Sequence, residues 1–216
     1  MKKILLVSLV MLLAVSAAFS QFGIKGGINL GTFGGADKAP DLKYRMGITG
    51  GISYRIGLIA GISLQPEVMY IQKGAVSEVN TLQGIYTIND KRTAMLDYID
   101  IPLLVKFNLP IPVFSPYIEG GVSYGILLSA KSKFEESSNQ PGTTSISNET
   151  DEKDFITKND LSIIVGVGFD LSILEIDARY MIGTKKLYKD DPTLSPNPGD
   201  SKIYNNGIIL TAGFRF

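Results

Sequence analysis

The chain has 216 residues, with 21 lysines and arginines against 21 aspartates and glutamates. This balance provides no field to attract nucleic acid, so we predict no nucleic-acid partner. The absence of histidine and cysteine excludes imidazole and thiol catalysis, histidine metal sites and disulfide bonds.

The start of the chain is arranged like a secretory signal peptide. Two lysines precede a short apolar run, and a stretch of small residues ending at Ser20 follows. A retained membrane anchor is the alternative, but the run is short and no stop-transfer pattern follows it. We therefore predict a signal peptide over residues 1–20 and a single exported domain over residues 21–216. In that domain no segment approaches the roughly 18 continuous apolar residues of a membrane helix.

Eight segments of the exported domain alternate apolar and polar residues with a period of two, which is typical of β-strands with one apolar face. In chain order they cover residues 22–31, 44–56, 62–71, 98–107, 117–128, 161–171, 174–183 and 207–216. In the fourth segment Ile101, Leu103 and Val105 share one face, while Asp100 and Lys106 lie on the other. None of the segments offers a helical stripe of comparable quality.

The connections between these segments alternate in length. Short ones lie near residues 57–58, 108–114 and 172–173, and longer polar ones cover residues 34–43, 74–92, 130–160 and 184–204. Outer-membrane barrels have this rhythm, with short periplasmic turns, long outer loops and both termini on the periplasmic side. We therefore predict an all-β fold, an eight-stranded antiparallel up-and-down transmembrane β-barrel.

A soluble up-and-down barrel of the lipocalin type is the structural rival. Such a barrel would hold apolar residues inside and charges outside. Here the polar face carries glycine, serine and isolated charges, and the apolar face carries aromatic residues that suggest girdles at the two membrane interfaces. These aromatic residues are Tyr44, Tyr54, Tyr70, Phe107, Phe169, Tyr180, Phe214 and Phe216. The pattern favours the membrane barrel.

Two features of the strands lead to specific expectations. Pro66 and Pro102 lie inside predicted strands and remove a backbone donor from a closed sheet, so we expect a β-bulge at each. Phe216 is the last apolar position of the final strand, and we predict that it faces lipid at the periplasmic rim.

The polar faces of the predicted strands hold charged residues of both signs that would point into the lumen. They are Lys25, Arg45, Arg55, Lys106, Arg179, Arg215, Glu67, Asp100, Glu119, Asp170, Glu175 and Asp177. An unpaired charge there would cost several kcal/mol, so we predict a mutually compensated network that fills the lumen. Its middle is expected to consist of Glu67, Lys106, Glu119 and Arg179. A polar plug is the favoured function of this network, and an ion or proton path is the alternative.

No catalytic, cofactor or metal site is indicated. Carboxylate pairs such as Asp100 and Glu119 remain, but pairs of this kind in a charged lumen are usually structural. The acidic connection over residues 130–160 could bind calcium, or a cation that bridges to lipopolysaccharide. A solvated, mobile loop is the favoured interpretation of that segment.

Several short motifs occur in a fixed order along the exported domain. They are LQPEVMY at residues 64–70 followed by Lys73 and Gly74, YIDIPLLVKF at 98–107, PYIEGG at 116–121, GVG at 166–168, ARY at 178–180 and the terminal aromatic. In this order and spacing they resemble the PorT-like outer-membrane β-barrel family. The resemblance implies a place in the outer membrane, contact with its lipid, and folding by the barrel-assembly machinery, which would recognise the last strand with Phe216 as an assembly signal.

The predicted function is a structural or interaction role without enzyme activity, with an unidentified protein partner at the outer loops. A narrow pore is one alternative. An accessory role in protein export is a second, implied by the resemblance because the founding member of the PorT-like family is implicated in export. A lipid-modifying enzyme with a serine or aspartate on an outer loop is a third.

Overall fold

The computed structural model describes residues 21–39, 41–59, 61–83, 86–109, 111, 114–138, 145–189 and 202–216. The predicted signal peptide lies outside these ranges. The strands within them are β1 (Phe22–Gly34), β2 (Leu42–Tyr54), β3 (Ile56–Gly57), β4 (Ile62–Gln83), β5 (Tyr86–Asn108), β6 (Ser115–Ser138), β7 (Ile146–Asp151), β8 (Asn159–Leu171), β9 (Leu174–Gly183) and β10 (Tyr204–Arg215). No helix in these ranges is long and apolar enough to cross a membrane.

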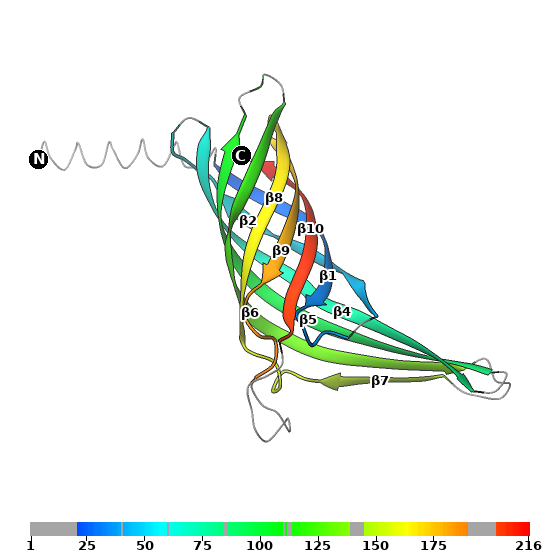
Figure 1. Cartoon of the computed structure of the whole chain (residues 1–216). Helices are drawn as coiled ribbons and strands as arrows, with labels where there is room; N and C mark the ends of the chain where they lie inside the picture. The colour runs from blue at the N-terminus through cyan, green and yellow to red at the C-terminus, as the bar shows by residue number, and fades with distance from the viewer. Residues whose placement is uncertain are drawn as a thin grey trace, which may run out of the picture.

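Eight of the strands close into a ring (Figure 1). The short strands β3 and β7 lie outside this ring and pair with β4 and β6. Each strand of the ring pairs antiparallel with the ring strand before and after it in the chain. The pairing of β1 with β10 closes the ring, in a register that runs from Gly23 opposite Arg215 to Gly34 opposite Tyr204. This confirms the predicted eight-stranded antiparallel up-and-down barrel.

The two faces of the barrel wall differ as the alternation predicts. On β5, Leu103 and Val105 are 45% and 50% exposed on the outer surface, whereas Lys106 is 0% exposed and Asp100 is 3% exposed inside. A soluble barrel would need the reverse arrangement, because its outer surface meets water. The outer surface of this barrel is therefore suited to lipid.

Three strands are much longer than predicted and leave the barrel together. β4, β5 and β6 have 22, 23 and 24 residues, and with β7 they form a sheet that projects from the long-loop end (Figure 1). Most of residues 74–92, predicted as a loop, and part of residues 130–160 are thus β-structure. Water reaches both faces of this projecting sheet, so its strands lack the apolar alternation by which the strands of the barrel wall are recognised.

The predicted bulges at Pro66 and Pro102 are wrong. The pairing of β4 with β5 keeps one register from Ile62 opposite Phe107 to Met69 opposite Asp100. The register instead shifts between Tyr44 and Thr49 in the β2–β4 pair, and between Asp97 and Tyr98 in the β5–β6 pair. In the first of these shifts the facing stretch of β4 contains Gly74, whose φ of 126° suits glycine and strains other residues.

Candidate functional site in the barrel lumen

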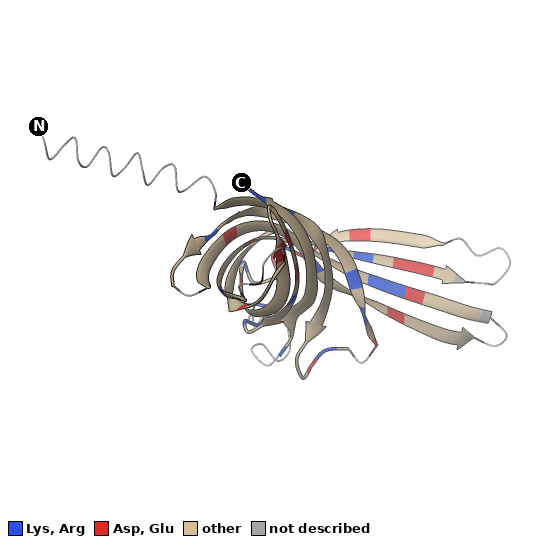
Figure 2. Cartoon of the chain, turned by 90° about the horizontal axis from the view of Figure 1, so that it is seen from above, with Lys and Arg blue, Asp and Glu red and all other residues tan. Residues whose placement is uncertain are grey.

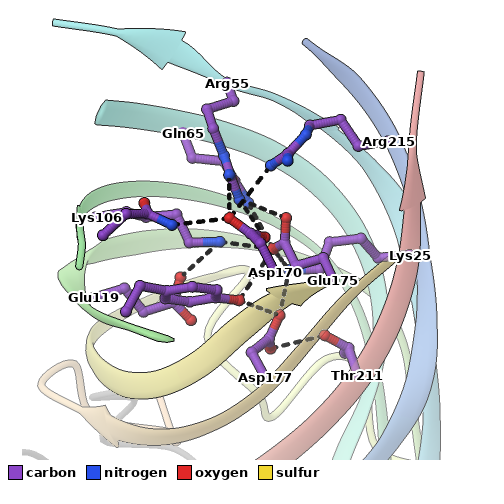
Figure 3. Close-up of polar contacts among 12 residues, drawn as sticks. Lys25, Arg55, Gln65, Lys106, Glu119, Asp170, Glu175, Asp177, Thr211 and Arg215 are labelled. Atoms are coloured by element: carbon purple, nitrogen blue, oxygen red, sulfur yellow. Dashed lines mark hydrogen bonds and ion pairs between the residues drawn. The ribbon is translucent and has the colours of Figure 1, made fainter. Parts of the chain in front are cut away.

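Charged side chains fill the lumen at the short-turn end of the barrel (Figure 3). We call this set the turn-end network: Lys25, Arg55, Glu67, Lys106, Glu119, Asp170, Glu175, Asp177, Arg179 and Arg215. Apart from Arg55, which follows β2, each occupies an inward position of a strand whose sequence neighbours face outward. The register of the ring then brings residues that are far apart in the sequence to a similar height along the barrel axis.

Arg179 on β9 joins two carboxylates from other strands. Its Nη1 lies 2.6 Å from Oε2 of Glu67 on β4, and its Nε lies 2.6 Å from Oε1 of Glu119 on β6. The planar guanidinium has donors in a fixed fork, so one arginine can hold both partners with short charge-assisted bonds. Lys106 Nζ lies 3.5 Å from Glu119 Oε2. The structure therefore brings together the four residues expected at the middle of the network.

Glu175 is the second centre of the turn-end network and accepts from three cations. Lys25 Nζ and Lys106 Nζ lie 2.8 Å and 2.6 Å from its Oε1. Arg55 Nη2 lies 2.6 Å from Oε2 of the same carboxylate. The ammonium of Lys106 also lies 3.9 Å from the centre of the Tyr117 ring, which adds a cation–π contact.

The charges of the turn-end network balance. It contains five cations, Lys25, Arg55, Lys106, Arg179 and Arg215, and five carboxylates, Glu67, Glu119, Asp170, Glu175 and Asp177. Burying a charge is costly unless an opposite charge and further hydrogen bonds accompany it. Thr211 Oγ1 supplies one such bond by donating to Asp177 Oδ1 at 2.7 Å. The network therefore has the composition of a plug whose charges are satisfied from within.

A second, smaller set of polar residues lies toward the long-loop end and is separate from this network. We call it the loop-end cluster: Lys73, Tyr98, Asp100, Asp160 and Asn205. Lys73 Nζ lies 2.9 Å from Asp100 Oδ2 and 2.8 Å from Asp160 Oδ2. Asn205 Nδ2 donates to Asp160 Oδ2 at 3.2 Å. Asp100 was predicted to be part of one network with Glu119, and the structure instead pairs it with Lys73.

Apolar layers separate and cover the two polar sets. One line of the register passes from Leu104 on β5 through Gly121 on β6 to Ile164 on β8 and Met181 on β9, between the turn-end network and the loop-end cluster. Leu104, Ile164 and Met181 are each 1% exposed or less. Beyond the cluster, Ile156 and Leu187 from the long connections are 2% and 3% exposed within the apolar core. A backbone hydrogen bond of 2.8 Å from Thr157 N to Leu187 O ties these connections together. The lumen is therefore closed at this end.

Arg45 does not join either polar set. Its Nη1 donates to the backbone oxygen of Lys73 at 2.6 Å, and the carboxylate that acts on it most strongly is Asp97. The register shift beside it explains this position, because the alternation of β2 against β4 is interrupted there. Lys73 and Asp160 were not predicted, although each continues the alternation by one step, beyond Ile71 and before Ser162.

Carboxylates of both polar sets take part in ion pairs. The predicted carboxylate pair of Asp100 and Glu119 is not formed, because the two residues lie in different polar sets with the apolar layer between them. Within the described ranges no three acidic side chains gather into a group suited to hold a metal ion. The Glu67 and Glu119 carboxylates each hold the Arg179 guanidinium, which leaves them as ion-pair partners.

The projecting sheet carries charges of both signs in stripes that cross its strands (Figure 2). Lys131 Nζ lies 2.6 Å from Glu149 Oε1, and Lys133 Nζ lies 2.8 Å from Glu135 Oε1. The hydrogen bond from Lys133 lowers the pKa of the Glu135 carboxyl below its usual value. All residues of β7 are exposed, and within the described ranges β7 pairs with β6 alone. Its outer edge therefore presents free backbone donors and acceptors.

Comparison with known proteins identifies a family for the chain. The family model described as "Outer membrane protein beta-barrel domain" matches residues 16–188. No curated protein matches the chain.

Several solved structures are similar to the chain over most of its length. The structure of Ail, the attachment invasion locus protein of Yersinia pestis, in complex with the heparin analogue sucrose octasulfate, is 16% identical, and the match covers 91% of this chain and 98% of that chain with a TM-score of 0.40. Neisserial surface protein A is 10% identical over 90% of this chain and 97% of its own, with a TM-score of 0.41. OprG from Pseudomonas aeruginosa is 12% identical over 92% and 97%, with a TM-score of 0.38.

Proposed function

The chain belongs to the outer membrane protein beta-barrel domain family, and on that premise we propose that it acts in the bacterial outer membrane as a closed barrel with a structural or interaction role. The order of layers in the lumen carries this proposal. A charge-balanced network, an apolar layer, the loop-end cluster and an apolar cap follow one another along the barrel axis. An ion entering from either end would meet a barrier of dry side chains or of satisfied pairs.

Current measurements in planar bilayers test the closed lumen. We expect the refolded protein to give no discrete current steps. Leu187→Ala, which loosens the apolar cap, should stay silent as well, because the turn-end network still blocks the other end of the lumen. Steady unitary currents from the unaltered protein would instead favour the narrow pore.

The projecting sheet supports the interaction role. It stands beyond the barrel at the end that outer-membrane barrels turn to the exterior, and the free edge of β7 can pair with an extended segment of another chain. A photo-reactive side chain at Ser147 on β7 should therefore crosslink to protein in intact cells. The matched control is Ile163 on the barrel wall, which is 45% exposed toward lipid. Equal protein crosslinking from both positions, or none from Ser147, would contradict a partner at the sheet.

The narrower assignment to the PorT-like family, and with it an export accessory role, rests on the motifs in β4, β5, β6, β8 and β9 and on the terminal aromatic residue. Those motifs contain Glu67, Asp100, Lys106 and Glu119, which all take part in lumen ion pairs. A structural role inside the barrel therefore accounts for these charged residues of the motifs. Co-purification with export components would support the accessory role, and turnover of labelled lipid A by the purified protein would contradict the non-enzymatic proposal.

Phe216 is proposed to act in assembly, with the barrel-assembly machinery as the partner. Its backbone N–H donates to Phe22 O at 2.8 Å, while its side chain is 64% exposed and contributes little packing. Deleting Phe216 should therefore reduce the amount of heat-modifiable barrel in cell outer membranes, yet leave the urea midpoint of refolded protein nearly unchanged. Phe216→Leu, which keeps an apolar terminus, should assemble better than the deletion. Normal assembly of the deletion in cells would contradict the role.

A further inference from the structure

The loop-end cluster carries one more negative charge than positive charge, unlike the turn-end network. Its charged groups are the Lys73 ammonium and the Asp100 and Asp160 carboxylates, with exposures of 1%, 3% and 3%. The charges that act most strongly on Lys73 are these two carboxylates, and those that act on Asp100 are Lys73 and Asp160. Arg45 is engaged with the Lys73 backbone oxygen and with Asp97. A buried net charge of this kind is costly unless something else compensates it.

Oxygen atoms without a partner surround the same place. Asp100 Oδ1, Ser123 Oγ and Ser162 Oγ are buried; the Ser123 hydroxyl lies within hydrogen-bonding reach of the Asp100 carboxylate, but the pair is poorly aligned, and Ser162 Oγ has no partner among the described residues. Ser123 and Ser162 are directly opposite each other on β6 and β8, and Ser123 lies beside the Asp100 carboxylate. Both serines are 1% exposed. Buried polar atoms are nearly always satisfied, so this group of oxygens calls for a partner.

The orientation of Asp100 shows where that partner would lie. Lys73 occupies the Oδ2 side of the carboxylate at 2.9 Å, so Oδ1 is turned the other way, over Gly125. Gly125 pairs with Asp100 on one side and with Asp160 on the other. A Cβ atom at residue 125 would lie 2.6 Å from Asp100 Oδ1 and 3.1 Å from Asp160 Cβ. A side chain at residue 125 would therefore push against the Asp100 carboxylate, and glycine leaves Asp100 Oδ1 uncovered in the space between the two acids, beside the serine hydroxyls.

We propose that this space binds one monovalent cation such as Na⁺, held by Asp100 Oδ1, the Asp160 carboxylate and the hydroxyls of Ser123 and Ser162. A hard cation takes oxygen ligands of these types. One positive charge brings the cluster to neutrality, whereas a divalent ion would leave it positive beside Lys73. Water could satisfy the hydroxyls but would leave the excess charge in place. A proton on Asp100 would remove the charge, and its O–H could donate to Ser123 Oγ, but Ser162 Oγ would still lack a partner.

Line broadening of ²³Na in solutions of the refolded protein tests the site directly. We expect the unaltered protein to broaden the signal, and K⁺ added at constant ionic strength to compete. Asp100→Asn removes the excess charge and should weaken the binding by about tenfold or more. Asp151→Asn, the same change on the exposed strand β7, should bind as the unaltered protein does.

Gly125→Ala provides a second variant that keeps every charge and fills the space. It should lose the broadening even if Asp100→Asn fails to fold. Equal broadening by the unaltered protein and by Gly125→Ala would overturn the site. A protein that gives no broadening, and whose stability depends on pH but not on Na⁺, would show that a proton on Asp100 compensates the charge instead.

Discussion

Replacing Arg179 with methionine should destabilise the barrel by about 3–5 kcal/mol, the cost of leaving buried carboxylates without their partner. Arg179 is 3% exposed. Its guanidinium lies 2.6 Å from the carboxylate of Glu67 and 2.6 Å from that of Glu119. Because methionine fills similar space, the loss of stability reports mainly the removal of the positive charge and less a change in packing. The urea midpoint of the refolded protein, read from gel mobility with and without boiling, gives the change.

Two comparisons separate the ion pairs from a general effect of the substitution. Arg92→Met changes the same residue type on the projecting sheet, where Arg92 is exposed and lies over the Phe134 ring, and should cost no more than about 1 kcal/mol. Adding Glu67→Gln to Arg179→Met should recover part of the lost stability, because four cations of the turn-end network then face four carboxylates. An unaltered midpoint for Arg179→Met alone would mean that water reaches these carboxylates and that the lumen is open.

Two adjacent glycines on β6 should respond in opposite ways to the same substitution. A Cβ at Gly121 points inward and would lie 2.0 Å from the backbone oxygen of Leu103, whereas a Cβ at Gly120 points outward and meets nothing nearer than 3.7 Å. Backbone atoms cannot move aside as the end of a flexible side chain can. Gly121→Ala should therefore reduce the stability by about 3 kcal/mol or more. Gly120→Ala should be neutral or slightly stabilising, because alanine restricts the unfolded chain. The heat-modifiable fraction and the urea midpoint measure both variants.

The glycine pair also tests the strand register. If the inward and outward faces of β6 were exchanged, Gly120→Ala would be the harmful variant. Equal effects of the two substitutions would mean that the wall is loose enough at this level to accept a methyl group on either face. Either result would contradict the close approach of β5 and β6 around Leu104 and Gly121.

Alternation in the sequence was sufficient to predict the ring of strands and the direction of most side chains. The inward direction of Lys106 and the outward direction of Val105, for example, follow from the period of two, because one face of each strand had to meet lipid. Lys73 and Asp160 were missed because the predicted strands ended where their apolar positions ended. The projecting parts of β4, β5 and β6 were missed for a related reason, since a strand with water on both faces shows no apolar alternation.

The alternation of the sequence does not predict which charges in the lumen pair with each other. Which carboxylate meets Arg179 depends on how β4, β6 and β9 are staggered around the barrel, and stagger is a property of the closed ring. Asp100 illustrates the limit: its inward direction was predicted, but its separation from Glu119 depends on the apolar layer formed by Leu104, Ile164 and Met181. The register shift beside Gly74 keeps Arg45 out of both the turn-end network and the loop-end cluster. The apolar pattern of the sequence gives no sign of this shift either.

A spin-label scan along β5 in lipid bilayers tests the central claim most directly, namely that this wall turns its aliphatic face to lipid and its charged face to a closed lumen. The chain has no cysteine, so single cysteines can be introduced one at a time from Tyr98 to Phe107. Collision with oxygen dissolved in the bilayer should be high at Ile99, Ile101, Leu103, Val105 and Phe107, and low at the alternate positions, where water-soluble quenchers should also fail to reach the label. A profile without the period of two, or one with the faces exchanged, would contradict the account.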